Sequence, residues 1–202
     1  MKKLISLVVL MAFAGAAGSV TAAGNAAAGK GRSAMCVGCH GVDGNSPAPN
    51  FPKLAGLDAQ HTAKQLADFK SGARKDPIMA GMAAALSRKD MDDLGAYFAS
   101  QKRSVGKPGA SADALARAER LYRGGDAKNG IAACMSCHGP TGAGIPPRFP
   151  AVSGQHATYS QKQLLDFKTG ARSNDGEIMT RIAFRLTEAE IKAVSEYMAG
   201  LR

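Results

Sequence analysis

Apolar residues at helical spacing occur in two segments of the chain, one near its middle and one at its end. The positions that form these apolar faces are Met91, Leu94, Tyr97 and Phe98 in the first segment and Ile191, Val194, Tyr197 and Met198 in the second. Each segment starts with the residue types of a capping box, Ser87 with Asp90 and Thr187 with Glu190. The pattern predicts one amphipathic helix in each half of the chain.

A second helix is predicted upstream of this one in each half. Its apolar pair is Leu66 and Phe69 in one half, and Leu164 and Phe167 in the other. A glycine follows each pair, Gly72 or Gly170, as is common at the end of a helix. The Gly/Pro-rich stretches 41–52 and 139–150 predict long loops, and no segment alternates with the period of two that a strand requires. We therefore expect an all-α protein.

The two halves are copies of each other, which explains why their patterns agree. The Cys-x-x-Cys-His motif that begins at Cys36 recurs at Cys134, an offset of 98 positions. After residue 172 the second copy carries two more residues than the first, so the offset becomes 100 and Met79 matches Met179. The repeat predicts two small tandem domains with the same fold.

These patterns divide the chain into four parts. We expect a signal peptide at 1–22, an N-terminal domain at 23–100, a linker at 101–112 and a C-terminal domain at 113–202. The linker contains glycine, proline and serine, a composition that predicts a polar and exposed course. Each domain is small for an apolar core of its own, and a large buried cofactor would help to stabilise it.

The first residues have the layout of an export signal. Lys2 and Lys3 precede the short apolar run 4–17, and small residues at 20–22 provide a cleavage site before Ala23. The alternative is an uncleaved membrane anchor, for which this apolar run is short. No later stretch approaches the ~20 apolar residues that cross a bilayer. We expect a mature protein in the periplasm.

The net charge of the chain adds little to the prediction of its function. Lys and Arg number 26 against 16 Asp and Glu, a formal net charge of +10. The basic residues are scattered rather than clustered, and an exported protein does not meet nucleic acid. The surplus is compatible with an acidic protein partner.

All cysteines of the chain lie in the two Cys-x-x-Cys-His motifs. They are Cys36, Cys39, Cys134 and Cys137, followed by His40 and His138. This spacing is the attachment signature of c-type haem, in which two thioethers bind the porphyrin and the histidine binds the iron. We expect two covalently attached haem c groups, with His40 and His138 as axial ligands.

Two other uses of these cysteines agree less well with the sequence. A disulfide or thioredoxin-like redox pair would use Cys-x-x-Cys, but it explains neither the histidines nor the helical pattern. A zinc site made from four thiolates needs cysteine pairs about 15 to 20 residues apart, far closer than the offset of the repeat.

The other histidines do not offer a second axial ligand that both copies share. His61 matches Tyr159, and His156 matches Asp58. We therefore expect both to be surface histidines near the start of a helix.

Methionine is the alternative axial ligand, and the repeat selects it. Met79 and Met179 match each other and are predicted on a loop before the last helix of each domain. Met82 matches Ile182, so it is the second choice for the first haem. A His/Met pair leaves no open position on the iron, which favours electron transfer over substrate binding. We expect an electron carrier, not an enzyme.

The chain resembles the cytochrome c4 family of tandem dihaem c-type cytochromes. The similarity covers both Cys-x-x-Cys-His motifs, the segments 45–56 and 153–157, and the paired Lys-Gln-Leu and Gly-Ala-Arg stretches. It implies two cytochrome c-like domains, each a small helical fold around one haem, related by pseudo-twofold symmetry. It also implies a periplasmic protein, membrane-associated in some members. The implied partners are a quinol–cytochrome c reductase and a terminal oxidase such as the cbb3 type.

The same resemblance implies roles for residues outside the motifs. Pro52 and Pro150 match the family proline whose carbonyl accepts the ring N–H of the axial histidine. Arg74 and Arg172 would contact haem propionates or carry an exposed charge at a helix end. The alternative function is the dihaem subunit of a larger dehydrogenase, such as a flavocytochrome c sulfide dehydrogenase. A dihaem peroxidase or thiosulfate dehydrogenase would need two unequal haems, which the matched methionines do not predict.

Overall fold

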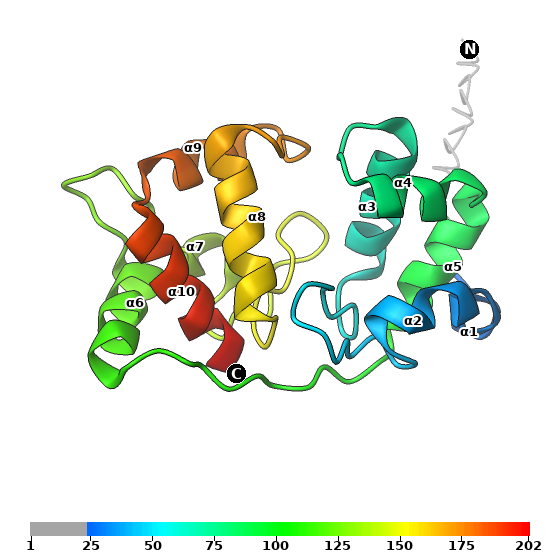
Figure 1. Ribbon diagram of the computed structural model, residues 1–202, viewed down its shortest axis with the longest axis horizontal. Helices are drawn as coiled ribbons and strands as arrows, with labels where there is room; N and C mark the ends of the chain where they lie inside the picture. The colour runs from blue at the N-terminus through cyan, green and yellow to red at the C-terminus, as the bar shows by residue number, and fades with distance from the viewer. Residues whose placement is uncertain (1–23) are drawn as a thin grey trace, which may run out of the picture.

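The computed structural model describes residues 24–202 as two helical units joined by an extended segment that runs along one side (Figure 1). The predicted signal peptide lies outside the described residues. The first unit contains α1 (Ala26–Arg32), the 3-10 helix η1 (Ser33–Cys36), α2 (Val37–His40), α3 (Ala59–Ser71), α4 (Pro77–Ala84) and α5 (Arg88–Ala99). The second contains α6 (Ala112–Gly124), α7 (Met135–His138), α8 (Ala157–Thr169), α9 (Ile178–Arg185) and α10 (Glu188–Gly200). Within 24–202 the only β-structure is two isolated bridges, so the all-α prediction is confirmed.

The predicted helix ends have the expected local chemistry. Both capping boxes are present, Ser87 with Asp90 at the start of α5 and Thr187 with Glu190 at the start of α10. α3 and α8 each end at a glycine in the left-handed region, where a side chain would be strained. Local residue choice therefore determined these boundaries.

The helices that carry Met79 and Met179 correct the prediction of a loop. Both methionines lie in the first turn of a short helix, α4 or α9. α4 starts with Asp76 as N-cap and Pro77 at the first turn, and the Asp76 carboxylate accepts a hydrogen bond from Met79 N at 2.9 Å. These start signals are in the sequence, but the residues of α4 are apolar on nearly every side of the helix, so no amphipathic period marks it.

Each unit is held together by contacts between its first and last helices. α1 packs on α5, and α6 packs on α10, while α3 and α8 cover the other side of these last helices. α1 approaches α5 so closely that a Cβ added to Gly29 would lie only 2.0 Å from the carbonyl oxygen of Asp93. The buried residues form one small apolar cluster per unit. Met91 and Met198 belong to these clusters, as predicted.

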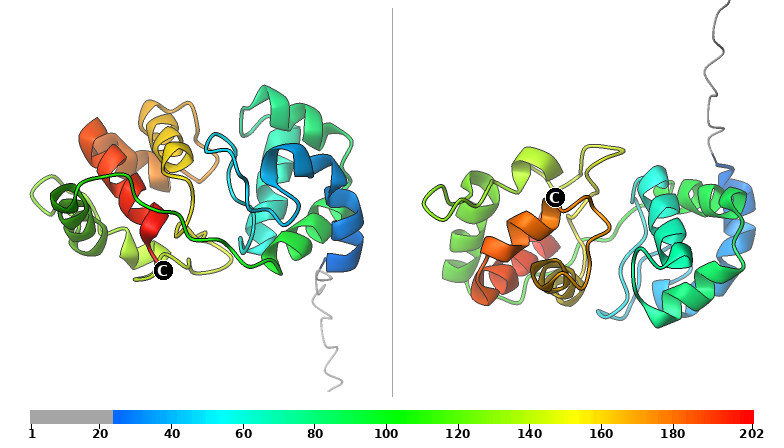
Figure 2. Two further views of the ribbon diagram at one scale, coloured as in Figure 1. Left: turned by 60° about the horizontal axis from the view of Figure 1, so that its bottom comes forward. Right: turned by 90° about the horizontal axis from the view of Figure 1, so that it is seen from above.

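The loops that follow the two motifs lie between the units both in the tilted view and in the view from above (Figure 2). The segment 101–112 is mostly exposed, but Arg103 is an exception. Its guanidinium donates to the carbonyl of Ala55 in the first unit at 2.6 Å and to that of Ser153 in the second at 3.0 Å. The connection is therefore attached to both units.

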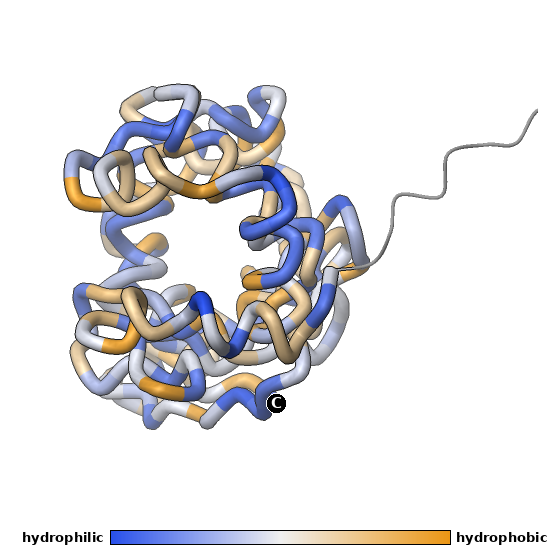
Figure 3. Tube along the Cα trace, turned by 90° about the vertical axis from the view of Figure 1, so that its right-hand side faces the viewer, coloured by the Kyte–Doolittle hydropathy of each residue, from blue (hydrophilic) through white to orange (hydrophobic). Residues whose placement is uncertain are grey.

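When the molecule is viewed down the axis that joins the units, apolar residues occur singly or in short runs along the chain, between polar residues (Figure 3). None of the helices within 24–202 is both long enough and apolar enough to cross a membrane.

Candidate functional site

The two Cys-x-x-Cys-His motifs form one tight turn in each unit. In the second unit the turn is closed by a hydrogen bond of 2.9 Å from His138 N to Cys134 O. The glycine that follows each histidine, Gly41 or Gly139, has a positive φ of 80° or 77°. The chain thus reverses direction after the histidine and leaves both cysteines and the histidine on one short turn.

Each motif histidine is buried and oriented by a proline carbonyl. His40 Nδ1 donates to Pro52 O and His138 Nδ1 donates to Pro150 O, both at 2.8 Å. Burial lowers the pKa of His40 and of His138, so both rings are neutral near pH 7. With the proton on Nδ1, the lone pair lies on Nε2, the nitrogen that is available to a metal.

The cysteines do not have the properties of a redox pair. All four are free thiols in the described chain. Burial raises the pKa of the Cys36 thiol and raises that of Cys134 to about 11. A reactive thioredoxin-like cysteine requires a lowered pKa, which neither Cys36 nor Cys134 has. Attachment to a cofactor suits them better than disulfide exchange.

The methionines predicted as ligands occupy matching places in the two units. The backbone N–H of each is held by an aspartate, Met79 by Asp76 and Met179 by Asp175. Both thioethers are half-buried, one turn before a fully buried alanine, Ala83 or Ala183. Met82 is also half-buried on α4, so burial does not separate it from Met79.

The side chains at each site suit a haem iron, whose equatorial ligands come from the porphyrin, better than a bare metal ion. Within residues 24–202, no three His, Cys, Asp or Glu side chains are grouped so that they could hold a bare metal ion. Each unit provides two thiols, one neutral imidazole and a thioether. A haem iron needs two axial ligands and its porphyrin needs two thioether bonds, so these residues fit one haem c per unit.

A polar cluster connects the two units through equivalent residues. Arg74 donates to Gln65 of its own unit and to Gln163 of the other, at 2.8 and 2.7 Å. Arg172 repeats this arrangement with Gln163 at 2.8 Å and Gln65 at 3.1 Å. Arg74 also donates to the hydroxyl of Tyr159 at 2.8 Å. The arginines therefore face the other unit, and the interpretation as exposed charges at a helix end is wrong.

The prediction that His61 and His156 lie on the surface is also wrong, because neither residue is exposed. His61 is half-buried on α3, and burial together with the positive charges of Arg172 and Arg74 lowers its pKa to about 4. His156 caps α8, and its Nε2 lies 2.9 Å from the carbonyl oxygen of Ser46 in the first unit. Both lie near a helix start as expected, but both are half-buried; His156 contacts the opposite unit, and His61 lies close enough to Arg172 of the opposite unit for its charge to lower the pKa.

A second contact between the units joins Lys53 to Gln155. The Gln155 side chain accepts from Lys53 N at 2.8 Å and donates to Lys53 O at 2.9 Å. The Lys53 ammonium donates to the carbonyls of Gly154 and Ser104, at 3.0 and 2.9 Å. Local sequence patterns gave no signal for this contact, because it depends on how the units meet.

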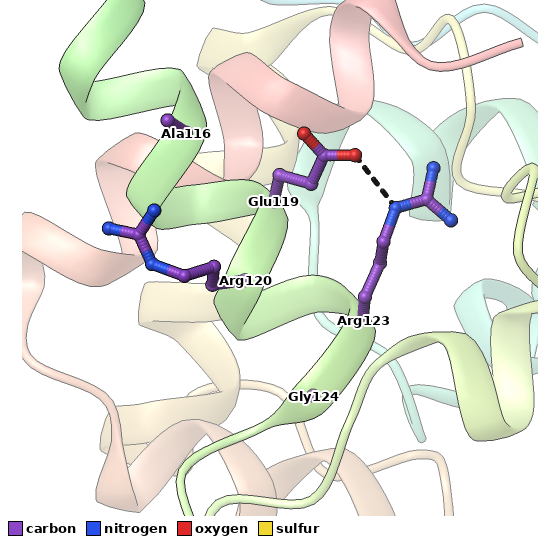
Figure 4. A pocket seen from close by; sticks show the side chains of 5 residues that line it. All are labelled: Ala116, Glu119, Arg120, Arg123 and Gly124. Atoms are coloured by element: carbon purple, nitrogen blue, oxygen red, sulfur yellow. Dashed lines mark hydrogen bonds and ion pairs between the residues drawn. The ribbon is translucent and has the colours of Figure 1, made fainter.

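A surface hollow on α6 is separate from these sites. It is lined by Ala116, Glu119, Arg120, Arg123 and Gly124 (Figure 4). Its one ion pair, Arg123 Nε to Glu119 Oε1 at 2.8 Å, is exposed. It contains none of the motif residues.

Comparisons with known proteins agree with this geometry. The family described as Cytochrome c matches residues 26–102 and 125–202, once in each unit. The fold, the repeat and the paired motifs thus define a two-domain c-type cytochrome with two haem c groups.

Full-length relatives narrow the class further. Cytochrome c4 of Pseudomonas aeruginosa is 50% identical over 203 residues, covering 99% of this chain and 98% of its own. The crystal structure of reduced recombinant cytochrome c4 from Pseudomonas stutzeri matches with a TM-score of 0.86 and 47% identity, covering 89% of this chain and 100% of that one. The thiosulfate dehydrogenase electron acceptor of Thiomonas intermedia is 42% identical over 171 residues, 83% of this chain and 78% of its own. The chain belongs to the cytochrome c4 family and is a dihaem electron carrier.

Proposed function

We propose that His40 with Met79, and His138 with Met179, are the axial ligands of the two haem irons. Cys36 with Cys39 and Cys134 with Cys137 would form the thioethers. The bound haem iron supplies one-electron redox chemistry, and the thioether ligand favours its reduced form. Pro52 and Pro150 hold each imidazole in one tautomer and one orientation.

The observation that carries this proposal is the equality of the two sites. Both histidines donate to a proline carbonyl at 2.8 Å, and both methionines lie in the first turn of a short helix, where the backbone N–H of each donates to an aspartate. Two six-coordinate sites leave no place for a substrate on the iron, which is the arrangement that electron transfer requires. An enzyme with one open haem would need the two sites to differ.

We further propose that the protein works in the periplasm after removal of residues 1–22, with domains at 23–100 and 113–202 and a connection at 101–112. It would accept electrons from a quinol–cytochrome c reductase and deliver them to a terminal oxidase such as the cbb3 type. The export signal and the family support this assignment. The experiment is oxygen uptake by oxidase-containing membranes, with the reduced protein as the only electron donor.

A second candidate function is electron acceptance from a dehydrogenase. It is favoured by the 42% identity to a relative named thiosulfate dehydrogenase electron acceptor. The same sample would be mixed in its oxidised form with a thiosulfate dehydrogenase and thiosulfate. Rapid haem reduction there, together with no oxygen uptake in the oxidase assay, would favour this candidate.

A further inference from the structure

The contact between Gln155 and Lys53 is buried and uses both ends of the glutamine amide. Gln155 and Lys53 are 7% and 5% exposed. The amide oxygen accepts from Lys53 N at 2.8 Å, and the amide nitrogen donates to Lys53 O at 2.9 Å. Two hydrogen bonds from one planar amide hold the Lys53 backbone in a single orientation.

This contact continues directly to a motif histidine. The Lys53 N–H belongs to the same peptide group as the Pro52 carbonyl, and that carbonyl accepts from His40 Nδ1 at 2.8 Å. His40, the peptide and the Gln155 amide therefore form a chain of hydrogen bonds across the boundary between the units. Hydrogen bonds in such a chain polarise one another, by about 10–30% per bond. The Pro52 oxygen becomes a stronger acceptor when Gln155 binds the other end of its peptide.

The second unit has the histidine bond without this extension. His138 donates to Pro150 at the same distance of 2.8 Å, but the next residue is Ala151. Its N–H has no protein acceptor within the described part of the chain. In the first unit, the residue that matches Gln155 is Leu57, whose side chain has no amide and cannot form these hydrogen bonds.

We propose that Gln155 is a positioning residue for the haem of the opposite unit, lowering the reduction potential of the first haem relative to the second. The proposal rests on axial ligation by His40. A stronger bond from Nδ1 makes the imidazole a more basic ligand, and a more basic ligand stabilises the oxidised iron. The duplicated sites thereby acquire different potentials through a contact that only one of them makes.

The test compares three variants of the mature dihaem protein. Gln155→Leu introduces the residue of the matching position and removes both hydrogen bonds. Gln155→Glu keeps an acceptor for Lys53 N. His156→Phe removes another contact between the units, the one to Ser46, and leaves the Pro52–Lys53 peptide untouched. Potentials are measured by spectroelectrochemical titration, and the two haems are assigned from their hyperfine-shifted proton resonances.

We expect Gln155→Leu to move the one-electron distribution between the haems toward the first haem by about two- to tenfold. The His40 Nδ1 proton of the reduced protein should shift upfield, while that of His138 stays in place. Gln155→Glu should retain the wild-type distribution or move it the other way, and His156→Phe should leave it unchanged. An unchanged distribution in Gln155→Leu, or equal effects of Gln155→Leu and His156→Phe, would overturn the proposal.

Two controls separate this outcome from other failures. Absence of His40 ring resonances from the hyperfine-shifted region of the wild-type protein would contradict the ligand assignment itself, independently of Gln155. If Gln155→Leu yields no folded protein, Gln155→Glu decides. It keeps the acceptor for Lys53 N and loses only the bond to Lys53 O, so a shift of the electron distribution toward the first haem in this variant would overturn the proposal.

Discussion

In the first unit His40 donates to Pro52, and in the second His138 donates to Pro150, with the same distance of 2.8 Å. At the boundary between the units this equality ends. His61 stands where the second unit has Tyr159, and Lys53 stands where it has Ala151. The residues around each motif are thus alike and several residues that face the other unit are not. The comparison teaches that two copies of one site can be made unequal by the contacts between them, without a change in the ligands.

Removal of the attachment cysteines from one unit tests whether each unit depends on its own haem. We expect Cys36→Ala combined with Cys39→Ala to lose one haem and the helical structure of the first unit, because its apolar cluster is small. Mass spectrometry of the exported protein gives the haem count, and circular dichroism gives the helix content. Cys134→Ala with Cys137→Ala is the mirror control. Two haem masses in either variant would contradict covalent attachment at these residues.

Replacement of each methionine tests the proposed equality of the ligands. We expect Met79→Ala or Met179→Ala to open one iron only, lower its potential and remove about half of the methionine-to-iron absorption band near the red edge. The other haem should keep its spectrum, because its own ligands are untouched.

Met82→Ala is the control for α4 and should leave both haems six-coordinate. The opposite result, with the band lost in Met82→Ala and kept in Met79→Ala, would show that the ligand assignment is wrong for the first unit.

The helix α1 differs from α6 in its close approach to the last helix. We expect Gly29→Ala to lower the free energy of unfolding of the first unit by about 2–4 kcal/mol, since its Cβ would lie 2.0 Å from Asp93 O. Gly31 lies on the same helix, where an added Cβ has nothing within 4 Å. Gly31→Ala should therefore stabilise by about 0.5–1 kcal/mol. Denaturant unfolding followed at the first haem distinguishes the two, and equal effects would argue against the tight packing.

The smallest expected effect concerns the pH dependence of stability, and it comes from His61, whose matching residue in the second unit is Tyr159. Burial, followed by the charges of Arg172 and Arg74, lowers the pKa of His61 to about 4 from an ordinary value of 6.5. The unfolded chain then binds more protons between these values, so stability is complete above pH 6.5 and falls as the pH drops toward 4. We expect a loss on the order of 1 kcal/mol after allowance for partial solvent exposure.

His61→Tyr makes the two positions alike and should remove this pH dependence. The measurement is the unfolding midpoint at several pH values between 4 and 7. A variant with the same slope as the wild type would assign the pH dependence to other groups.

Local signals predicted much of each unit. The capping boxes, the glycine helix ends and the Cys-x-x-Cys-His turns depend on residues a few positions apart, so they can be recognised without a fold. The pattern does not predict the short helix α4, although Asp76 and Pro77 mark its start, because its residues are apolar on nearly every side. His61 and His156 were placed on the surface because the element that covers them lies about a hundred residues away in the chain.

The sequence by itself determined that the protein is a tandem of two helical domains with two haem c groups, since the repeat and the motifs are properties of the chain. The tertiary structure alone decided which side chains lie between the domains. Gln155 meets Lys53, Arg74 meets Gln163, and Arg103 bridges Ala55 to Ser153. A side chain in such a place obeys no local periodicity, because its partner is set by the packing of two domains rather than by the turn of one helix.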